Sequence, residues 1–218
     1  MEGLQEIKAL EKPPARAVSG GSPRPDAEAD PTTPDRKIQQ LEAFRLPPGF
    51  RGRSGAFVQL WWLVQALLVK PLPQICFPLR RALLRAFGAK IGVGVRIRPG
   101  VEVTYPWKLV IGDHSWIGDD VTLYSLGSIT IGSNTVISQK SYICAADHDY
   151  SDRTFAIRER PVTIADEVWV AADTWVGPGV TIASGAVVGA RSTVTKDLPA
   201  GMICIGSPCR PIKPRITS

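Results

Sequence analysis

An aliphatic residue returns at every sixth position between Ile91 and Leu198. The array contains five sets of three: Ile91, Ile97 and Val103; Ile111, Ile117 and Leu123; Ile131, Ile137 and Ile143; Ile164, Val170 and Val176; Ile182, Val188 and Val194. A period of six fits neither an α-helix nor one long alternating strand. It predicts a solenoid of short parallel strands, with three faces to each coil and aliphatic side chains stacked between coils.

A glycine or alanine often follows the aliphatic residue, as at Gly92, Gly112 and Gly118. We expect these residues at corners where a larger side chain would clash or where the backbone dihedral angles are unusual. Between Ile143 and Ile164 the spacing is much larger, with roughly fifteen residues looped out. Interruptions of a rigid scaffold often carry function, so this loop is the place to seek it.

The array predicts a mainly β domain over residues 91–205, in which residues 202–205 form one more strand. Residues 1–50 are rich in proline and poor in residues that form a core, and they are predicted to be a disordered tail. Residues 206–218 form a basic tail punctuated by prolines.

The remaining segment, residues 51–90, is predicted to form two helices. Residues 56–69 are apolar except for two glutamines, but they are too few to span a bilayer. A second helix over residues 79–87 would end at Gly88. At 100° per residue, its apolar arc holds Leu79, Ala82, Leu83, Ala86 and Phe87, with Arg80, Arg81 and Arg85 opposite. Two compatible interpretations are a cap over the open end of the solenoid and a peripheral contact with an anionic membrane.

Charge and cysteine content narrow the class of protein. The net charge is +6, and residues 51–90 alone hold seven basic and no acidic side chains, so the predicted solenoid has no basic excess with which to follow nucleic acid. The four cysteines form no C-x-x-C pair and the histidines are only two, so we expect free thiols and no metal. Without a secretory signal in the first residues, the chain is predicted to be cytoplasmic, with or without contact at the inner face of the membrane.

His148 is the candidate for acid–base chemistry, because it lies where the third coil gives way to the looped-out segment. The alternative is a solvated loop histidine. The other histidine, His114, is predicted to be a surface position on the array. No serine or cysteine has the setting of a nucleophile, and no phosphate-binding glycine loop is present.

Five stretches carry a family resemblance: residues 84–92, 105–109, 147–150, 176–182 and 194–199. With these, residues 53–215 resemble the hexapeptide-repeat O-acetyltransferases, in particular the branch of the colanic acid acetyltransferases. The resemblance implies a left-handed parallel β-helix that assembles as a homotrimer. It also implies active sites in the clefts between subunits, partly covered by the looped-out segment.

The resemblance also implies roles for individual residues. His148 would be the general base that deprotonates a sugar hydroxyl as it attacks the thioester of acetyl-CoA, the co-substrate. Asp147 and Asp149 are candidates to orient the imidazole, although neighbours in the sequence often point apart. Asp149 and Trp169 are candidate acceptor contacts, although Trp169 would equally serve to pack a corner. Contacts with CoA are expected from Ala172, Ala190, Thr195, Lys196, Arg210 and Lys213. Ala171 and Ala172 replace a common Gly-Ser pair, and Arg191 replaces a common glycine.

The leading hypothesis is acetylation of a sugar hydroxyl in an exopolysaccharide or similar glycan precursor, of the kind that is often lipid-linked. A small soluble acceptor, such as a free sugar, a nucleotide sugar or serine, is the first alternative. A non-catalytic scaffold is the second. A metal site like that of carbonic anhydrases is disfavoured by the shortage of histidines.

Overall fold

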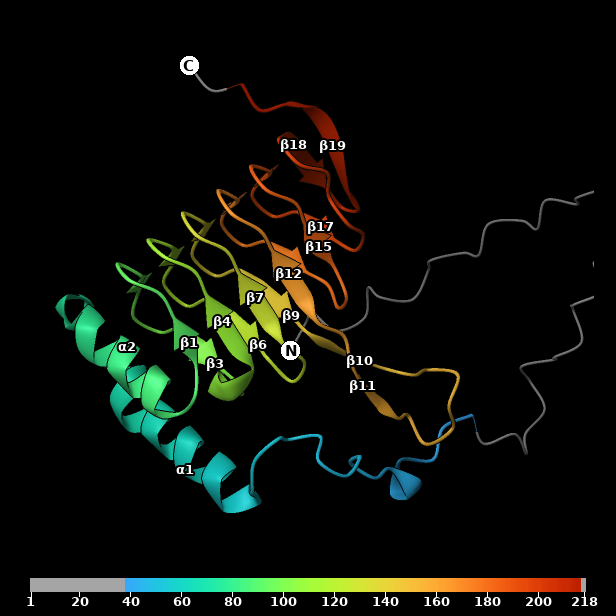
Figure 1. Cartoon of the computed structure of the whole chain (residues 1–218). Helices are drawn as coiled ribbons and strands as arrows, with labels where there is room; N and C mark the ends of the chain where they lie inside the picture. Colours follow the sequence, from blue (N-terminus) through green and yellow to red (C-terminus); the bar gives the residue numbers. More distant parts are fainter. Residues whose placement is uncertain (1–37, 217–218) are drawn as a thin grey trace, which may run out of the picture. The chain divides into compact units, whose positions relative to one another are not determined.

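Three parallel β-sheets form the faces of a solenoid (Figure 1). The computed structural model describes residues 38–216. Sheet A contains β1 (Lys90–Ile91), β4 (Leu109–Ile111), β7 (Ile129–Ile131), β12 (Val162–Ile164) and β15 (Thr181–Ile182). Sheet B contains β2 (Arg96–Ile97), β5 (Trp116–Ile117), β8 (Val136–Ile137), β13 (Trp169–Val170), β16 (Val187–Val188) and β18 (Met202–Gly206), with β19 (Cys209–Pro214) added antiparallel to β18. Sheet C contains β3 (Glu102–Val103), β6 (Thr122–Tyr124), β9 (Tyr142–Cys144), β14 (Trp175–Val176) and β17 (Thr193–Val194).

The predicted mainly β solenoid is confirmed, and its register is the one that the period of six requires. Ile111 pairs with Ile131, which pairs with Ile164, and the corresponding side chains form the buried core. Ile117 is almost completely buried, and so is every aliphatic residue of the third, fourth and fifth sets. A further, partial coil follows the five predicted ones, because Leu198 bridges to Ile182 and β18 extends sheet B.

The two reasons given for small residues at corners apply to two different positions. A Cβ added to Gly112 or Gly118 would lie 2.6 Å or 2.5 Å from a backbone nitrogen of the next coil, so the position after the aliphatic residue excludes side chains by contact. The left-handed backbone occurs two residues further on, as at His114 (φ 58°) and Arg191 (φ 59°). Arg191 therefore occupies a conformation that glycine adopts at less cost, which accounts for the glycine expected there.

Two helices cover the first coil. The first, α1 (Gly55–Val64), begins at Ser54, whose hydroxyl accepts a hydrogen bond from the backbone N–H of Phe57, and it continues as the π-helical η2 (Gln65–Val69). The second, α2 (Phe77–Ala86), ends before Gly88, which has the positive φ of a helix terminator. Three short 3₁₀ turns complete the elements: η1 (Leu41–Ala43), η3 (Gln74–Cys76) and η4 (Pro106–Lys108).

The arginines of α2, which lie opposite its predicted apolar arc, face the solenoid. Arg80 is fully buried and donates hydrogen bonds to the backbone oxygens of Ile97 (2.7 Å), Val69 (3.2 Å) and Leu72 (2.5 Å). Arg81 and Arg85 likewise donate to backbone oxygens of the first coil. The guanidinium groups satisfy carbonyls at the open end of the solenoid, and Leu79, on the predicted apolar arc, is 49% exposed.

Both predicted tails are shorter than expected. Residues 1–37 of the N-terminal tail lie outside the described residues, but residues 38–50 contact the fold: Phe50 is buried, and its carbonyl accepts a hydrogen bond from Lys108. At the other end, residues 209–214 form β19, so most of the predicted basic tail is a strand in sheet B.

Candidate active site

The looped-out segment is a β-hairpin that leaves the coil at the turn from sheet C to sheet A, which we call the catalytic corner. Its strands are β10 (Ala146–His148) and β11 (Ile157–Glu159), and His148 pairs with Ile157 at the end of β10. Residues 38–50 lie beside the hairpin, since the N–H of Gln40 donates to the carbonyl of Arg153. Figure 1 shows these two segments together at one side of the solenoid.

The imidazole of His148 is held by Phe155. Its Nδ1 lies 2.7 Å from the backbone oxygen of Phe155, and the two rings are stacked with centroids 4.1 Å apart. A carbonyl oxygen only accepts hydrogen bonds, so in the neutral imidazole Nδ1 carries the proton and Nε2 presents the lone pair. This is the tautomer that a general base needs. The carbonyl is aimed by a left-handed backbone at Phe155 (φ 54°), which is a strained conformation for a bulky residue.

Neither carboxylate beside His148 bonds to its imidazole, contrary to the expectation that one of them orients the ring. Asp147 accepts from Nε of Arg158 at 2.8 Å, and Asp149 accepts from Nη1 of the same guanidinium at 3.2 Å. Asp149 also accepts from the hydroxyl and N–H of Ser151, and these hydrogen bonds lower the pKa of its carboxyl. The two carboxylates therefore brace the hairpin, and a contact between Asp149 and the acceptor stays a prediction.

Cys144 precedes the hairpin but lacks the character of a nucleophile. Burial raises the pKa of its thiol, so the thiol is protonated at neutral pH. His114 lies at the turn from sheet A to sheet B, on a different corner from His148. The two histidines therefore lie at different corners of the solenoid and do not form one site within the chain.

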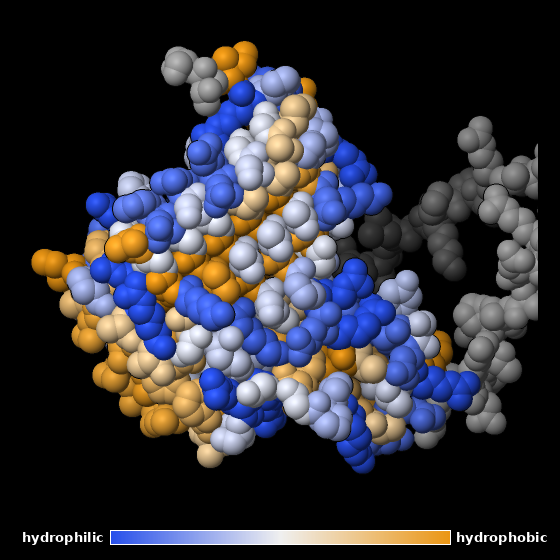
Figure 2. Space-filling view, viewed as in Figure 1, coloured by the Kyte–Doolittle hydropathy of each residue, from blue (hydrophilic) through white to orange (hydrophobic). Residues whose placement is uncertain are grey.

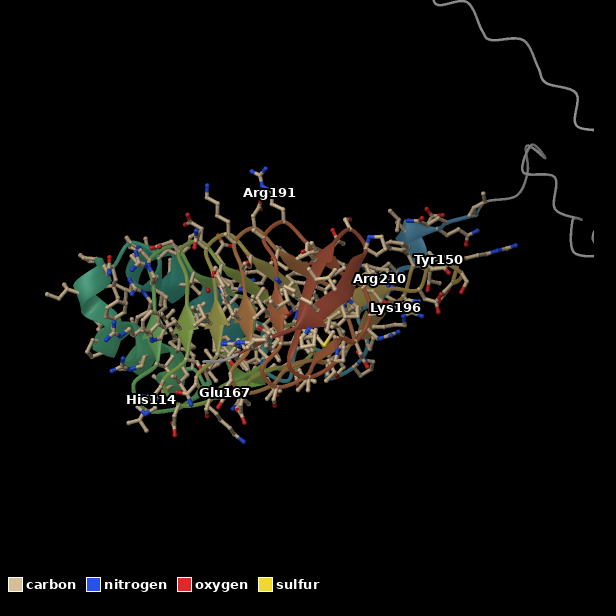
Figure 3. The ribbon with its side chains drawn as sticks, turned by 90° about the horizontal axis from the view of Figure 1, so that it is seen from above. His114, Tyr150, Glu167, Arg191, Lys196 and Arg210 are labelled. Atoms are coloured by element: carbon tan, nitrogen blue, oxygen red, sulfur yellow. The ribbon has the colours of Figure 1, made fainter. Side chains whose placement is uncertain are left out.

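The residues expected to contact CoA fall on two corners. Thr195 and Lys196 follow β17 at the catalytic corner, two coils beyond His148. Ala172 and Ala190 lie at the turn from sheet B to sheet C, where the N–H of Arg191 donates to the carbonyl of Ala172. In Figure 3, Lys196 lies on the side of the molecule where Tyr150 marks the hairpin, whereas Arg191 lies on another side.

The C-terminal strand contributes cations on sheet B, away from the catalytic corner. Arg210 and Lys213 lie on β19, paired with Ile205 and Ile203 of β18. Figure 3 labels Arg210 and Lys196 at the C-terminal end of the solenoid. Trp169 is on sheet B, the face opposite the catalytic corner, with its side chain 48% exposed and its Nε1 donating to the hydroxyl of Ser138. In one chain, therefore, Trp169 does not meet His148.

A groove runs over sheet C beside the helices. It has a volume of about 430 Å³ and is lined by Trp62, Gln65, Glu102, Val103, Thr104, Thr122, Tyr124 and Tyr142. Its lining ends at Tyr124, whose carbonyl accepts the N–H of Ala145 just before the hairpin. Aromatic rings beside hydroxyl, amide and carboxylate groups suit a sugar, which presents both apolar C–H faces and hydroxyls.

Sequence reasoning missed the residues that hold His148. Phe44 approaches its imidazole with ring centroids 6.1 Å apart, but it belongs to a segment assigned to the tail. Phe155 has no sequence signal. It accepts the hydrogen bond of His148 through its main-chain carbonyl, and its ring stacks on the imidazole only because of how the hairpin folds.

Comparison with known proteins decides the family. No family model matches the chain. Escherichia coli WcaF, which carries the name of a colanic acid biosynthesis acetyltransferase, is 52% identical over 179 residues, or 82% of this chain and 98% of the relative. The chain belongs to the hexapeptide-repeat acetyltransferases, in the branch of WcaF.

Solved structures agree with this assignment. The hexapeptide-repeat acetyltransferase VCA0836 of Vibrio cholerae matches with a TM-score of 0.68 and 26% identity, over 74% of this chain and 92% of that one. A galactoside acetyltransferase in complex with coenzyme A shares the fold at a TM-score of 0.69 and 23% identity, over 81% of this chain and 89% of that one. This hexapeptide-repeat protein is therefore an acetyltransferase on a parallel β-solenoid.

Proposed function

We propose that this acetyltransferase moves an acetyl group from acetyl-CoA to a sugar hydroxyl, with His148 as the general base. The observation that carries the proposal is the hydrogen bond from Nδ1 of His148 to the carbonyl of Phe155, because in the neutral imidazole it makes Nε2 the nitrogen with the free lone pair. Nε2 takes the hydroxyl proton while the hydroxyl oxygen attacks the thioester carbonyl. The C–S bond then breaks, and the CoA thiolate takes the proton back from the imidazolium.

The exposed cations of the C-terminal coils suit the donor. Lys196, Arg210 and Lys213 are all exposed on the C-terminal coils, where they are available to the phosphates of CoA. The galactoside acetyltransferase that shares the fold binds coenzyme A. The small side chains of Ala172 and Ala190 would let the pantetheine arm approach the backbone.

In this proposal the chain is a homotrimer, and each active site is completed by residues of two neighbouring subunits. One chain places its catalytic corner and its two cleft alanines on opposite edges of sheet C, so a single CoA does not reach both within that chain. In a three-fold assembly, the catalytic corner of one chain faces the B–C corner of the next. Exposed tryptophans on sheets B and C, Trp116, Trp169 and Trp175, suit such contacts between subunits.

The acceptor we favour is a lipid-linked precursor of an exopolysaccharide at the inner face of the cytoplasmic membrane. The 52% identical relative is named for colanic acid biosynthesis. The groove on sheet C offers aromatic and polar groups for a glycan rather than for an amino acid. A free or nucleotide-linked sugar is the alternative acceptor.

The test is CoA release from acetyl-CoA with a panel of sugars, nucleotide sugars and lipid-linked oligosaccharides, for wild type and His148→Ala. A general base contributes about 10²- to 10⁴-fold, so the variant should lose that much in kcat. Unchanged melting temperature and oligomeric mass would show that the variant still folds. Full activity of His148→Ala would overturn the mechanism.

A further inference from the structure

The helices that cover the first coil leave a wide apolar surface uncovered. On α1 and η2, Leu60, Trp62, Leu63, Leu67 and Leu68 are 44–63% exposed, and Ile75 and Leu79 continue the surface at 83% and 49%. We call these seven side chains the helical apolar surface. Figure 2 shows apolar colour spread over the position of α1 and α2. A helix that is apolar on all sides is normally buried, yet only its Val58, Trp61 and Val69 face is buried here.

Four of the seven cations of residues 51–90 are engaged within the fold. Arg80, Arg81 and Arg85 donate to carbonyls of the solenoid and its helices, and Lys70 pairs with Glu102. Residues 51–90 contain no carboxylate that would repel an anionic headgroup. The surface formed by the seven side chains is thus apolar, and the arginines of α2 do not contribute to it.

We propose that the helical apolar surface inserts into the headgroup–acyl boundary of a lipid bilayer, and that burial of apolar side chains drives the binding. Within residues 38–216 no helix is both long and apolar enough to span a bilayer. The fifteen residues of α1 and η2 would instead lie in the plane of the interface. Trp62 is an amphipathic aromatic suited to headgroup depth.

With the helical apolar surface in the bilayer, the groove on sheet C would lead from the membrane toward the candidate active site. Trp62 belongs both to the helical apolar surface and to the lining of the groove on sheet C. The groove reaches Tyr124, which pairs with Cys144 four residues before His148. This step rests on the proposed function: the lipid of a lipid-linked acceptor would stay in the bilayer while its sugar extends along the groove toward the catalytic corner.

The experiment measures partition of the full chain onto vesicles of phosphatidylcholine, with and without phosphatidylglycerol, at low and high salt. We expect binding to both compositions and little loss at high salt, because apolar burial is not screened. Leu67→Glu should weaken partition by about tenfold or more, since it removes an exposed leucine that the bilayer would bury and adds a charge. Ile212→Glu, on β19 at the far end of the solenoid, is the matched control and should bind as wild type does.

Binding only to anionic vesicles, with loss at high salt, would overturn the proposal. So would an oligomeric mass that falls in Leu67→Glu without lipid, because the surface would then bind a second copy of the chain. Activity on a soluble sugar separates this idea from the proposed function. A protein that binds vesicles through Leu67 but acetylates no acceptor would refute the reaction and leave the membrane contact intact.

Discussion

The Nη1 atom of Arg80 lies 2.7 Å from the backbone oxygen of Ile97, with no part of the arginine exposed to solvent. Burial lowers the pKa of the guanidinium, but a value normally near 12.5 leaves it charged at neutral pH. The cation is therefore held mainly by main-chain oxygens, and it ties α2 and η2 to the first coil.

Arg80→Met should destabilise the fold by about 3 kcal/mol or more, because several buried carbonyls would lose their donor. Urea denaturation at fixed protein concentration measures the change. Arg53→Met, at an exposed position, is the control and should change stability by less than about 0.5 kcal/mol. Equal stabilities of the two variants would show that Arg80 does not hold the cap.

Phe155→Gly should reduce kcat by about tenfold while leaving the melting temperature nearly unchanged. Glycine keeps the carbonyl that orients His148 and tolerates φ 54°, but it removes the stacked ring. An aromatic contact is worth about 0.5–1.5 kcal/mol, which corresponds to that loss if the imidazole loses its fixed position. Phe155→Tyr, which keeps the ring, should retain activity. Wild-type kcat in Phe155→Gly would mean that the stacking does not position the base.

Two inactive variants should complement each other if the site lies between subunits. His148→Ala removes the base, and Ala172→Trp would fill the cleft at the B–C corner. When the two are unfolded and reassembled together, random mixing would restore about a quarter of the sites, since some would combine an intact His148 with an intact Ala172 of the neighbour. CoA release measures the recovery. Mixed assemblies without activity would place both residues of each site in one chain.

Tyr142 should make stability depend on pH in alkaline solution. Burial, followed by nearby Cys144, raises the pKa of its phenol to about 12, against a value near 10 in the unfolded chain. The folded state keeps the proton that the unfolded state loses, so the contribution is complete below pH 10 and disappears as pH rises toward 12. Urea titrations across this window should show a smaller decline for Tyr142→Phe. Tyr150→Phe, whose ring is 86% exposed, should behave as wild type does.

The solenoid was predictable because its cause repeats in the sequence. Each inward side chain, such as Ile131, meets the equivalent residue one coil away, so a period of six records the packing directly. The direction of the α2 arginines was not predictable in the same way. Helical periodicity separates Arg80 from Leu79, but it does not say which face meets the solenoid, and the carbonyls that bind Arg80 leave no trace in the side-chain pattern.

The candidate site was predictable only in part. His148 could be selected by its residue type and its place at the break in the array. Its partner Phe155 could not, because it contacts the imidazole through a main-chain carbonyl and through a stacking that depends on the fold of the hairpin. The position of Phe44 beside the imidazole depends on a segment whose composition predicts no structure.

The even spacing of the later coils fixes the distance along the solenoid axis between His148 and Lys196. His148 leaves the third coil and Lys196 ends the fifth, and each coil adds about 4.8 Å along the axis. Duplicating residues 165–182 would keep every stacking contact in register, since Ile164 already pairs with Ile182. It would also move Lys196 one coil away from His148. If the proposed function holds, the number of coils sets the length of the acyl carrier that reaches from one residue to the other.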